Sequence, residues 1–215
     1  MGYMDAFYKD VERVGVVPVV VLDRVEDALP VADVLVRGGL PSAEVTFRTA
    51  CAADAIREMS EKRPNLMVGA GTVLTLDQAR RAVDAGARYI VTPGYNMEVV
   101  DWCLANEVPV LPAGVTPTEV TALVNKGLAV TKFFPAAQYG GLATIKALAS
   151  VFVGHRFMPT GGVSTANLRE YLECPAVLAC GGTWMVKPDL IRSGDFDRMY
   201  QLTREAALLV REVRG

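Results

Sequence analysis

The sequence predicts a (β/α)8 barrel, and three observations support that fold class. Eight short runs rich in apolar and β-branched residues recur along the chain, and their starts lie about 20 to 28 residues apart, the length of a strand-loop-helix-loop unit. The segments between them, such as residues 77–85, have the amphipathic spacing of helices. No GxGxxG motif follows the first run, so eight such units favour a closed barrel over an open doubly wound sheet.

The predicted elements cover nearly the whole chain. Strands are expected at residues 16–22, 43–47, 66–68, 89–91, 108–111, 129–133, 157–158 and 176–179. An extra helix over residues 4–14 precedes the first strand, and a closing helix covers residues 196–213. No linker or second core interrupts the pattern, so residues 1–215 are predicted to form one barrel domain.

Composition narrows the possible classes of function. Lys and Arg total 22 against 24 for Asp and Glu, which gives no basic surface for nucleic acid or for a membrane. Without a signal segment or an apolar span, a cytoplasmic protein is expected. The four cysteines are scattered and are expected to be reduced. His155 is the only histidine, so we expect it to be structural or solvated, and we expect neither a metal site nor a cofactor.

Lys132 is the lysine whose surroundings are unusual. It ends an apolar strand and precedes two phenylalanines, so its ammonium is predicted at the carboxyl end of a buried strand, where barrels place their reacting groups. Burial favours the neutral amine, which can attack a ketone carbonyl to form an iminium ion. A structural ion pair with Glu44 is the alternative.

Glu44 and Arg48 belong to the second predicted strand or its end. Strand alternation puts Glu44, Thr46 and Arg48 on one face. Aldol chemistry through a Schiff base needs a base that moves protons and a cation that holds a substrate carboxylate, and Glu44 and Arg48 suit these two roles. A buried ion pair between Glu44 and Arg48 would explain the pattern equally well.

Glycine-rich segments follow three of the predicted strands. The segment from Gly69 to Thr72 would allow a ligand to approach the backbone closely. Gly161-Gly162 and Gly181-Gly182-Thr183 follow the seventh and eighth strands, where barrels commonly bind phosphate through backbone amides. A phosphorylated substrate is therefore predicted, and tight turns without a ligand are the alternative.

Five ordered motifs resemble those of a known family. They are Glu44-Val-Thr-Phe-Arg48-Thr49, Gly69-Ala-Gly-Thr72-Val73, Lys132-Phe-Phe-Pro-Ala136, Pro159-Thr-Gly-Gly162 and Gly181-Gly-Thr-Trp184. Together they are similar to the bacterial 2-keto-3-deoxy-6-phosphogluconate (KDPG) aldolase, also called 2-keto-4-hydroxyglutarate (KHG) aldolase. The similarity extends from about Val16 to the C-terminus.

The resemblance implies a function and a set of site residues. The reaction would be cleavage of KDPG to pyruvate and glyceraldehyde 3-phosphate in the Entner-Doudoroff pathway, by a homotrimer. Lys132 would form the Schiff base and Glu44 would be the general acid and base. The implied substrate-binding residues are Arg48 and Thr72 for the pyruvyl carboxylate, Pro93 and Phe134 for the pocket wall, and Thr160, Gly161, Gly162, Gly182 and Thr183 for the phosphate.

Two departures from the family pattern leave the substrate open. Gln138 stands where many relatives have Glu, and Thr183 replaces a common Ser. An aldolase for the galactonate epimer is one alternative. A phosphate-binding epimerase or isomerase and a non-catalytic ligand-binding barrel are the others, but neither explains Lys132.

Overall fold

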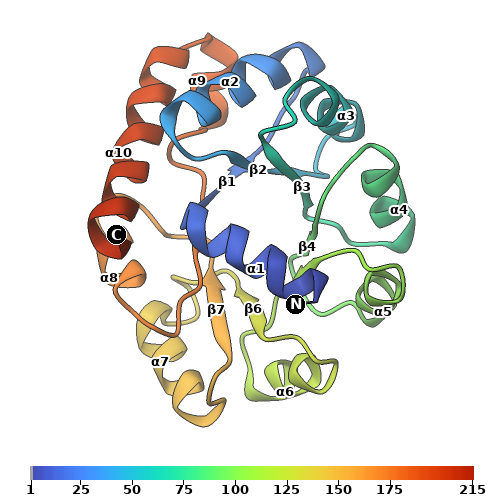
Figure 1. Ribbon diagram of the computed structural model, residues 1–215, viewed down its shortest axis with the longest axis vertical. Helices are drawn as coiled ribbons and strands as arrows, with labels where there is room; N and C mark the ends of the chain where they lie inside the picture. Colours follow the sequence, from blue (N-terminus) through green and yellow to red (C-terminus); the bar gives the residue numbers. More distant parts are fainter. Residues whose placement is uncertain (1) are drawn as a thin grey trace.

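Over residues 2–215, which the computed structural model describes, eight short strands alternate with helices and form the inner ring of the molecule (Figure 1). The strands are β1 (Val16–Val20), β2 (Ser42–Thr46), β3 (Met67–Gly71), β4 (Ile90–Thr92), β5 (Val110–Pro112), β6 (Val130–Phe133), β7 (Arg156–Pro159) and β8 (Cys180–Gly182). The helices are α1 (Tyr3–Val14), a 3-10 turn η1 (Val25–Asp27), α2 (Ala28–Gly38), α3 (Ala52–Lys62), α4 (Leu76–Asp84), α5 (Met97–Ala105), α6 (Pro117–Asn125), α7 (Gly141–Val151), α8 (Leu168–Leu172), α9 (Pro188–Ser193) and α10 (Phe196–Arg214).

The parallel strands close into a barrel. Six of them pair in the order β5-β4-β3-β2-β1-β8, and β6 pairs with β7. The two sheets meet where the amide of Gly114 donates to the carbonyl of Lys132 at 3.0 Å, and where Thr160 bridges Gly181. Because all strands are parallel, their carboxyl ends share one mouth, as the sequence predicts.

Side chains divide into an interior cluster and an outer layer. Val17, Val91, Leu111 and Met158 pack inside the barrel with other buried residues, whereas the helices cover the outward-facing positions of the strands. Figure 1 shows α1 lying across the barrel opening. Its buried face joins the interior cluster, so α1 plugs the end opposite the mouth.

Local sequence signals set the starts of several helices. Thr116 accepts a hydrogen bond from the amide of Glu119 at 3.3 Å, and the Glu119 side chain accepts from the amide of Thr116. This capping box, with Pro117 in the first turn, satisfies amides that would otherwise lack partners and begins α6 at the mouth of the barrel.

Predicted and observed boundaries agree closely except at the last strand. The helices predicted at residues 4–14 and 196–213 correspond to α1 and α10. The run predicted as the eighth strand, residues 176–179, instead precedes β8 and touches β7 through a single bridge at Val177. The strand itself uses Gly181 and Gly182, which pair with Val17 and Pro18.

His155 lies in the outer layer beside β6, not in the mouth. It is 7% exposed, and its Nε2 lies 2.7 Å from Thr131 Oγ1. Burial lowers the pKa of His155 below its ordinary value of 6.5, and a hydrogen bond with the backbone of Leu128 opposes this shift. The role is structural, and the solvated alternative is wrong. None of the helices in the described part of the chain is long and apolar enough to cross a membrane.

The lowered pKa of His155 predicts the direction of one pH effect on stability. As pH falls below 6.5, the unfolded chain takes up a proton first, so the free energy of unfolding should decrease between pH 7 and pH 5. Urea unfolding at both pH values should show a smaller decrease for His155→Gln. Proton NMR reads the pKa directly because the chain has one imidazole, and a value at or above 6.5 would contradict this account.

Candidate active site

The inward face of β2 is polar, although it lies inside the barrel. Ala43 and Val45 pack in the outer layer. The alternate positions are Ser42, Glu44 and Thr46, each with no exposed surface. Ser42 Oγ lies 3.3 Å from the hydroxyl of Tyr89, which belongs to the interior cluster. Strand alternation then directs all three polar side chains inward.

Lys132 and Glu44 meet across the interior. Lys132 Nζ lies 3.0 Å from Glu44 Oε1, and their side chains are 6% and 1% exposed. The same Nζ lies 5.5 Å from the centroid of the Phe134 ring. Removing two charges from water costs several kcal/mol per ion, and only a well-placed partner offsets this. A reacting pair and a structural pair would both make this contact.

Gly71 makes room for the Glu44 carboxylate. A Cβ built on Gly71 would lie 2.6 Å from Glu44 Cγ and would overlap Oε1. A Cβ on Gly69 would likewise overlap the Tyr89 ring. Both glycines therefore accommodate protein side chains, and the approach of a ligand to this backbone stays a prediction. Sequence reasoning missed Gly71 as a support for Glu44.

Arg48 points to Thr72 instead of Glu44. Arg48 Nε donates to Thr72 Oγ1 at 3.1 Å. Within residues 2–215, no carboxylate lies within ion-pair distance of Arg48, and Glu44 is paired with Lys132. The alternative of a buried Glu44-Arg48 pair is thus wrong. Thr72 has a φ of 55°, a left-handed conformation that costs a threonine free energy and that clusters at functional sites.

Gly161-Gly162, which follows β7, and Gly181-Gly182, which ends β8, lie side by side at the mouth, where Thr160 bridges Gly181. Gly161 and Gly162 have φ values of 90° and 83°, which favour glycine. In the described part of the chain, the amides of Gly162 and Thr183 donate to no protein acceptor. Thr160 Oγ1 is buried and also has no partner there.

The remaining residues singled out in the sequence, Pro93, Gly182 and Gln138, make no polar contact with Lys132 in the described part of the chain. Pro93 follows β4 at the same end of the barrel and is half-buried. A Cβ on Gly182 would overlap the Trp184 ring, so this glycine accommodates a protein side chain. Gln138 is exposed after β6.

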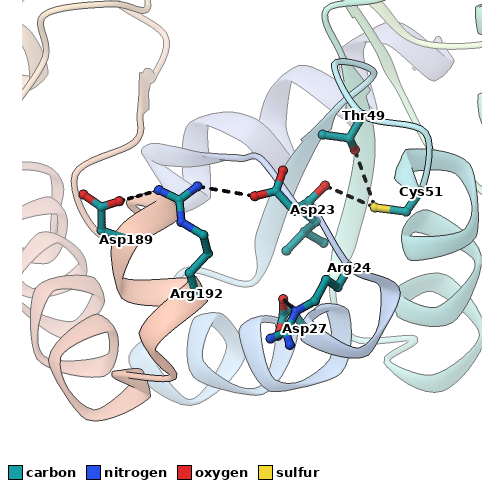
Figure 2. A network of polar contacts seen from close by, with 8 residues as sticks. Asp23, Arg24, Asp27, Thr49, Cys51, Asp189 and Arg192 are labelled. Atoms are coloured by element: carbon teal, nitrogen blue, oxygen red, sulfur yellow. Dashed lines mark hydrogen bonds and ion pairs between the residues drawn. The ribbon is translucent and has the colours of Figure 1, made fainter.

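Polar contacts around β1, β2 and α9 form part of the rim. Figure 2 shows Arg192 of α9 between Asp189 and Asp23, which follows β1; the pair with Asp23 is 3.4 Å long. Cys51 Sγ donates to the carbonyl of Leu22 at 3.1 Å. Exposed ion pairs of this kind contribute little stability.

A cavity of about 920 Å³ lies at the other end of the barrel. Its lining includes Val14, Pro41 and Asn65, which precede strands, and Arg214 near the C-terminus. None of the predicted site residues lines it. No group of three or more His, Cys, Asp or Glu side chains in residues 2–215 is placed to hold a metal ion.

A closed barrel with a buried amine and carboxylate at its mouth is an arrangement suited to aldol chemistry through a Schiff base. Residues 8–202 match the family model described as KDPG and KHG aldolase. The chain is 45% identical over 207 residues to the 2-dehydro-3-deoxy-phosphogluconate aldolase of Treponema pallidum, covering 96% of this chain and 99% of that one. The chain belongs to the KDPG and KHG aldolase family and is a carbon-carbon lyase.

Two solved structures of similar proteins carry ligands. The KDPG aldolase of Legionella pneumophila, with pyruvate captured as a covalent carbinolamine intermediate, has a TM-score of 0.90 and 36% identity, covering 93% of this chain and 97% of that one. The enzyme of Zymomonas mobilis ZM4 with 3-phosphoglycerate has a TM-score of 0.87 and 39% identity, covering 94% and 95%.

The space at Gly71 makes a testable prediction. In Gly71→Ala the new methyl group must displace the Glu44 carboxylate from Lys132, so turnover should fall roughly 100-fold or more, as when a general base is lost. Gly94→Ala is the matched control, because a Cβ there meets nothing within 4 Å. Steady-state rates of the two folded variants give the comparison, and similar rates would show that Gly71 does not support the site.

Proposed function

We propose that this aldolase cleaves KDPG to pyruvate and glyceraldehyde 3-phosphate through a Schiff base on Lys132. The observation that carries the proposal is the buried contact of 3.0 Å between Lys132 Nζ and Glu44 Oε1 at the mouth of the barrel. It supports the proposal because an amine beside a carboxylate can act as a nucleophile whose protons the carboxylate takes and returns. The Legionella relative, with its covalent pyruvate, supports this chemistry.

In the first stage the amine joins the keto carbon. Lys132 gives a proton to Glu44, and the neutral amine attacks C2 of the substrate to form a carbinolamine. Glu44 then returns a proton to the carbinolamine hydroxyl, which leaves as water and yields the iminium ion. The positive nitrogen next to C2 can accept the electron pair of the C3–C4 bond.

In the second stage that bond breaks. Glu44 removes the proton of the C4 hydroxyl, the C3–C4 electron pair moves into the enamine, and glyceraldehyde 3-phosphate departs. Protonation of C3 by the Glu44 carboxyl regenerates an iminium ion. Water adds to it, and pyruvate leaves with the lysine restored.

The Arg48-Thr72 contact supports a carboxylate site. Arg48 is exposed at the mouth and has no carboxylate partner within residues 2–215, so its guanidinium can bind the pyruvyl carboxylate beside the Thr72 hydroxyl. Phe134, already close to Lys132 Nζ, and Pro93 would line the pocket around C2 and C3.

The end of β8 and the loops after β7 and β8 would hold the distal phosphate. The free amides of Gly162 and Thr183, the Thr160 and Thr183 hydroxyls, and the backbone of Gly161 and Gly182 would supply its hydrogen bonds. The Zymomonas relative with 3-phosphoglycerate supports a phosphorylated ligand. KHG, which has no phosphate, would be a second substrate, split into pyruvate and glyoxylate.

The resemblance to the family also supports a cytoplasmic homotrimer with one barrel domain per chain. Sedimentation equilibrium measures the mass in solution. A single species of one or two chains at assay concentrations would contradict the trimer.

The assignment of Lys132 predicts a selective loss of activity. Lys132→Arg keeps a positive charge but cannot act as the amine nucleophile, so pyruvate release from KDPG should disappear. Lys126→Arg is the control, because Lys126 pairs with Asp101 at 2.5 Å on the surface and should tolerate the change. Cleavage of KDPG by the folded Lys132→Arg protein would contradict a mechanism through a Schiff base on Lys132.

The phosphate site predicts a difference between substrates. Inorganic phosphate should compete with KDPG but leave cleavage of KHG nearly unchanged, because only KDPG uses the amides after β7 and β8. Inhibition constants measured with both substrates test this. Equal inhibition of KDPG and KHG cleavage would contradict the assignment of these amides to the phosphate.

A further inference from the structure

Two oxygen atoms on the inward face of β2 are buried without a hydrogen-bond partner in the described part of the chain. Within residues 2–215, Glu44 Oε2 and Thr46 Oγ1 both lack one, and neither residue has exposed surface. A buried polar atom left unpaired costs about 1–3 kcal/mol, and more for a charged group. Such atoms in a native structure call for an explanation, such as a catalytic role or a bound water or ligand group.

The register of β2 and β3 places both atoms in one layer of the barrel. Thr46 lies directly opposite Gly71, and the Glu44 carboxylate reaches into the space beside Gly71. The carboxylate of Glu44 therefore lies at the level of Thr46, although no direct hydrogen bond joins the two side chains. Both side chains face inward, because they alternate with the outward-facing Val45, and Glu44 contacts Lys132.

We propose that Thr46 is a further catalytic residue, whose hydroxyl binds the oxygen that leaves C2 as water and returns when the iminium is hydrolysed. This rests on the proposed function of Lys132. Glu44 Oε1 faces the amine, which leaves Oε2 for this oxygen, and Thr46 holds it from the other side. A hydroxyl suits the task because it can donate to and accept from the same water.

Protons and bonds balance in both dehydration of the carbinolamine and hydrolysis of the iminium ion. On dehydration, the C2–O bond of the carbinolamine breaks, its oxygen takes the proton from the Glu44 carboxyl, and the nitrogen lone pair forms the C=N bond. On hydrolysis, Glu44 takes a proton from the same water as its oxygen attacks C2. Thr46 keeps its own proton and only orients the oxygen.

Thr46→Val removes the hydroxyl while keeping the β-branched shape that suits a strand. Slower hydration and dehydration should lower kcat for KDPG by roughly 10-fold or more, with little change in KM. Thr46→Ser should restore most of the rate. Thr203→Val is the matched control, because Thr203 is equally buried but its hydroxyl donates to the Met199 carbonyl in α10.

Deuterium exchange separates this role from a structural one. In heavy water, bound pyruvate gains deuterium at C3 for as long as the iminium-enamine pair survives. If Thr46 assists hydrolysis, pyruvate released early by Thr46→Val should carry two or three deuterons more often than pyruvate from the unmodified enzyme. Mass spectrometry of the initial product gives the distribution. If the valine protein does not fold, Thr46→Ala is measured in its place.

An unchanged kcat, or a deuterium distribution equal to that of the unmodified enzyme, would overturn the role of Thr46. Failure of the Schiff-base function has a different signature, because then the unmodified enzyme itself would not exchange the C3 protons of pyruvate. Failure of Thr46→Ser to restore the rate would assign the defect to packing.

Discussion

The buried contact between Lys132 and Glu44 is the constraint on which the rest of the site depends. Two opposite charges removed from water are tolerated only in close contact and fixed geometry. β6 and β2 direct the two side chains inward, and the missing side chain of Gly71 leaves room for the carboxylate. The pair therefore depends on three strands, β2, β3 and β6, and a change in any of them should alter turnover.

The barrel closes off the Lys132-Glu44 pair at the end covered by α1 and leaves it accessible at the mouth. Below the pair, Tyr89 and its neighbours fill the interior, and α1 covers the opposite opening with Phe7 and Tyr8. Burial raises the pKa of Tyr89 well above its ordinary value, so its hydroxyl stays neutral. Because side chains fill the interior below the pair, access to Lys132 is from the mouth, where Arg48 and the glycine segments lie.

Much of this could be predicted from the sequence because the informative residues conflict with their surroundings. Lys132 and Glu44 are charged residues within apolar strands, which marks them as candidates from the sequence alone. Other features could not be predicted without the three-dimensional structure. β2 ends at Thr46, so Arg48 leaves the face shared with Glu44 and turns to Thr72. Gly181 and Gly182 formed the last strand, although glycine ordinarily indicates a turn. Periodicity predicted α1 without showing which surface it covers.

Reductive trapping tests the central claim most directly, because it reports the covalent bond itself. Incubation with pyruvate and borohydride should inactivate the enzyme and add one reduced pyruvyl group to the peptide that contains Lys132, as located by mass spectrometry. The other lysines, including Lys126 and Lys146, serve as internal controls. Pyruvate-dependent labelling at one of those lysines, or full activity with no label, would contradict the account.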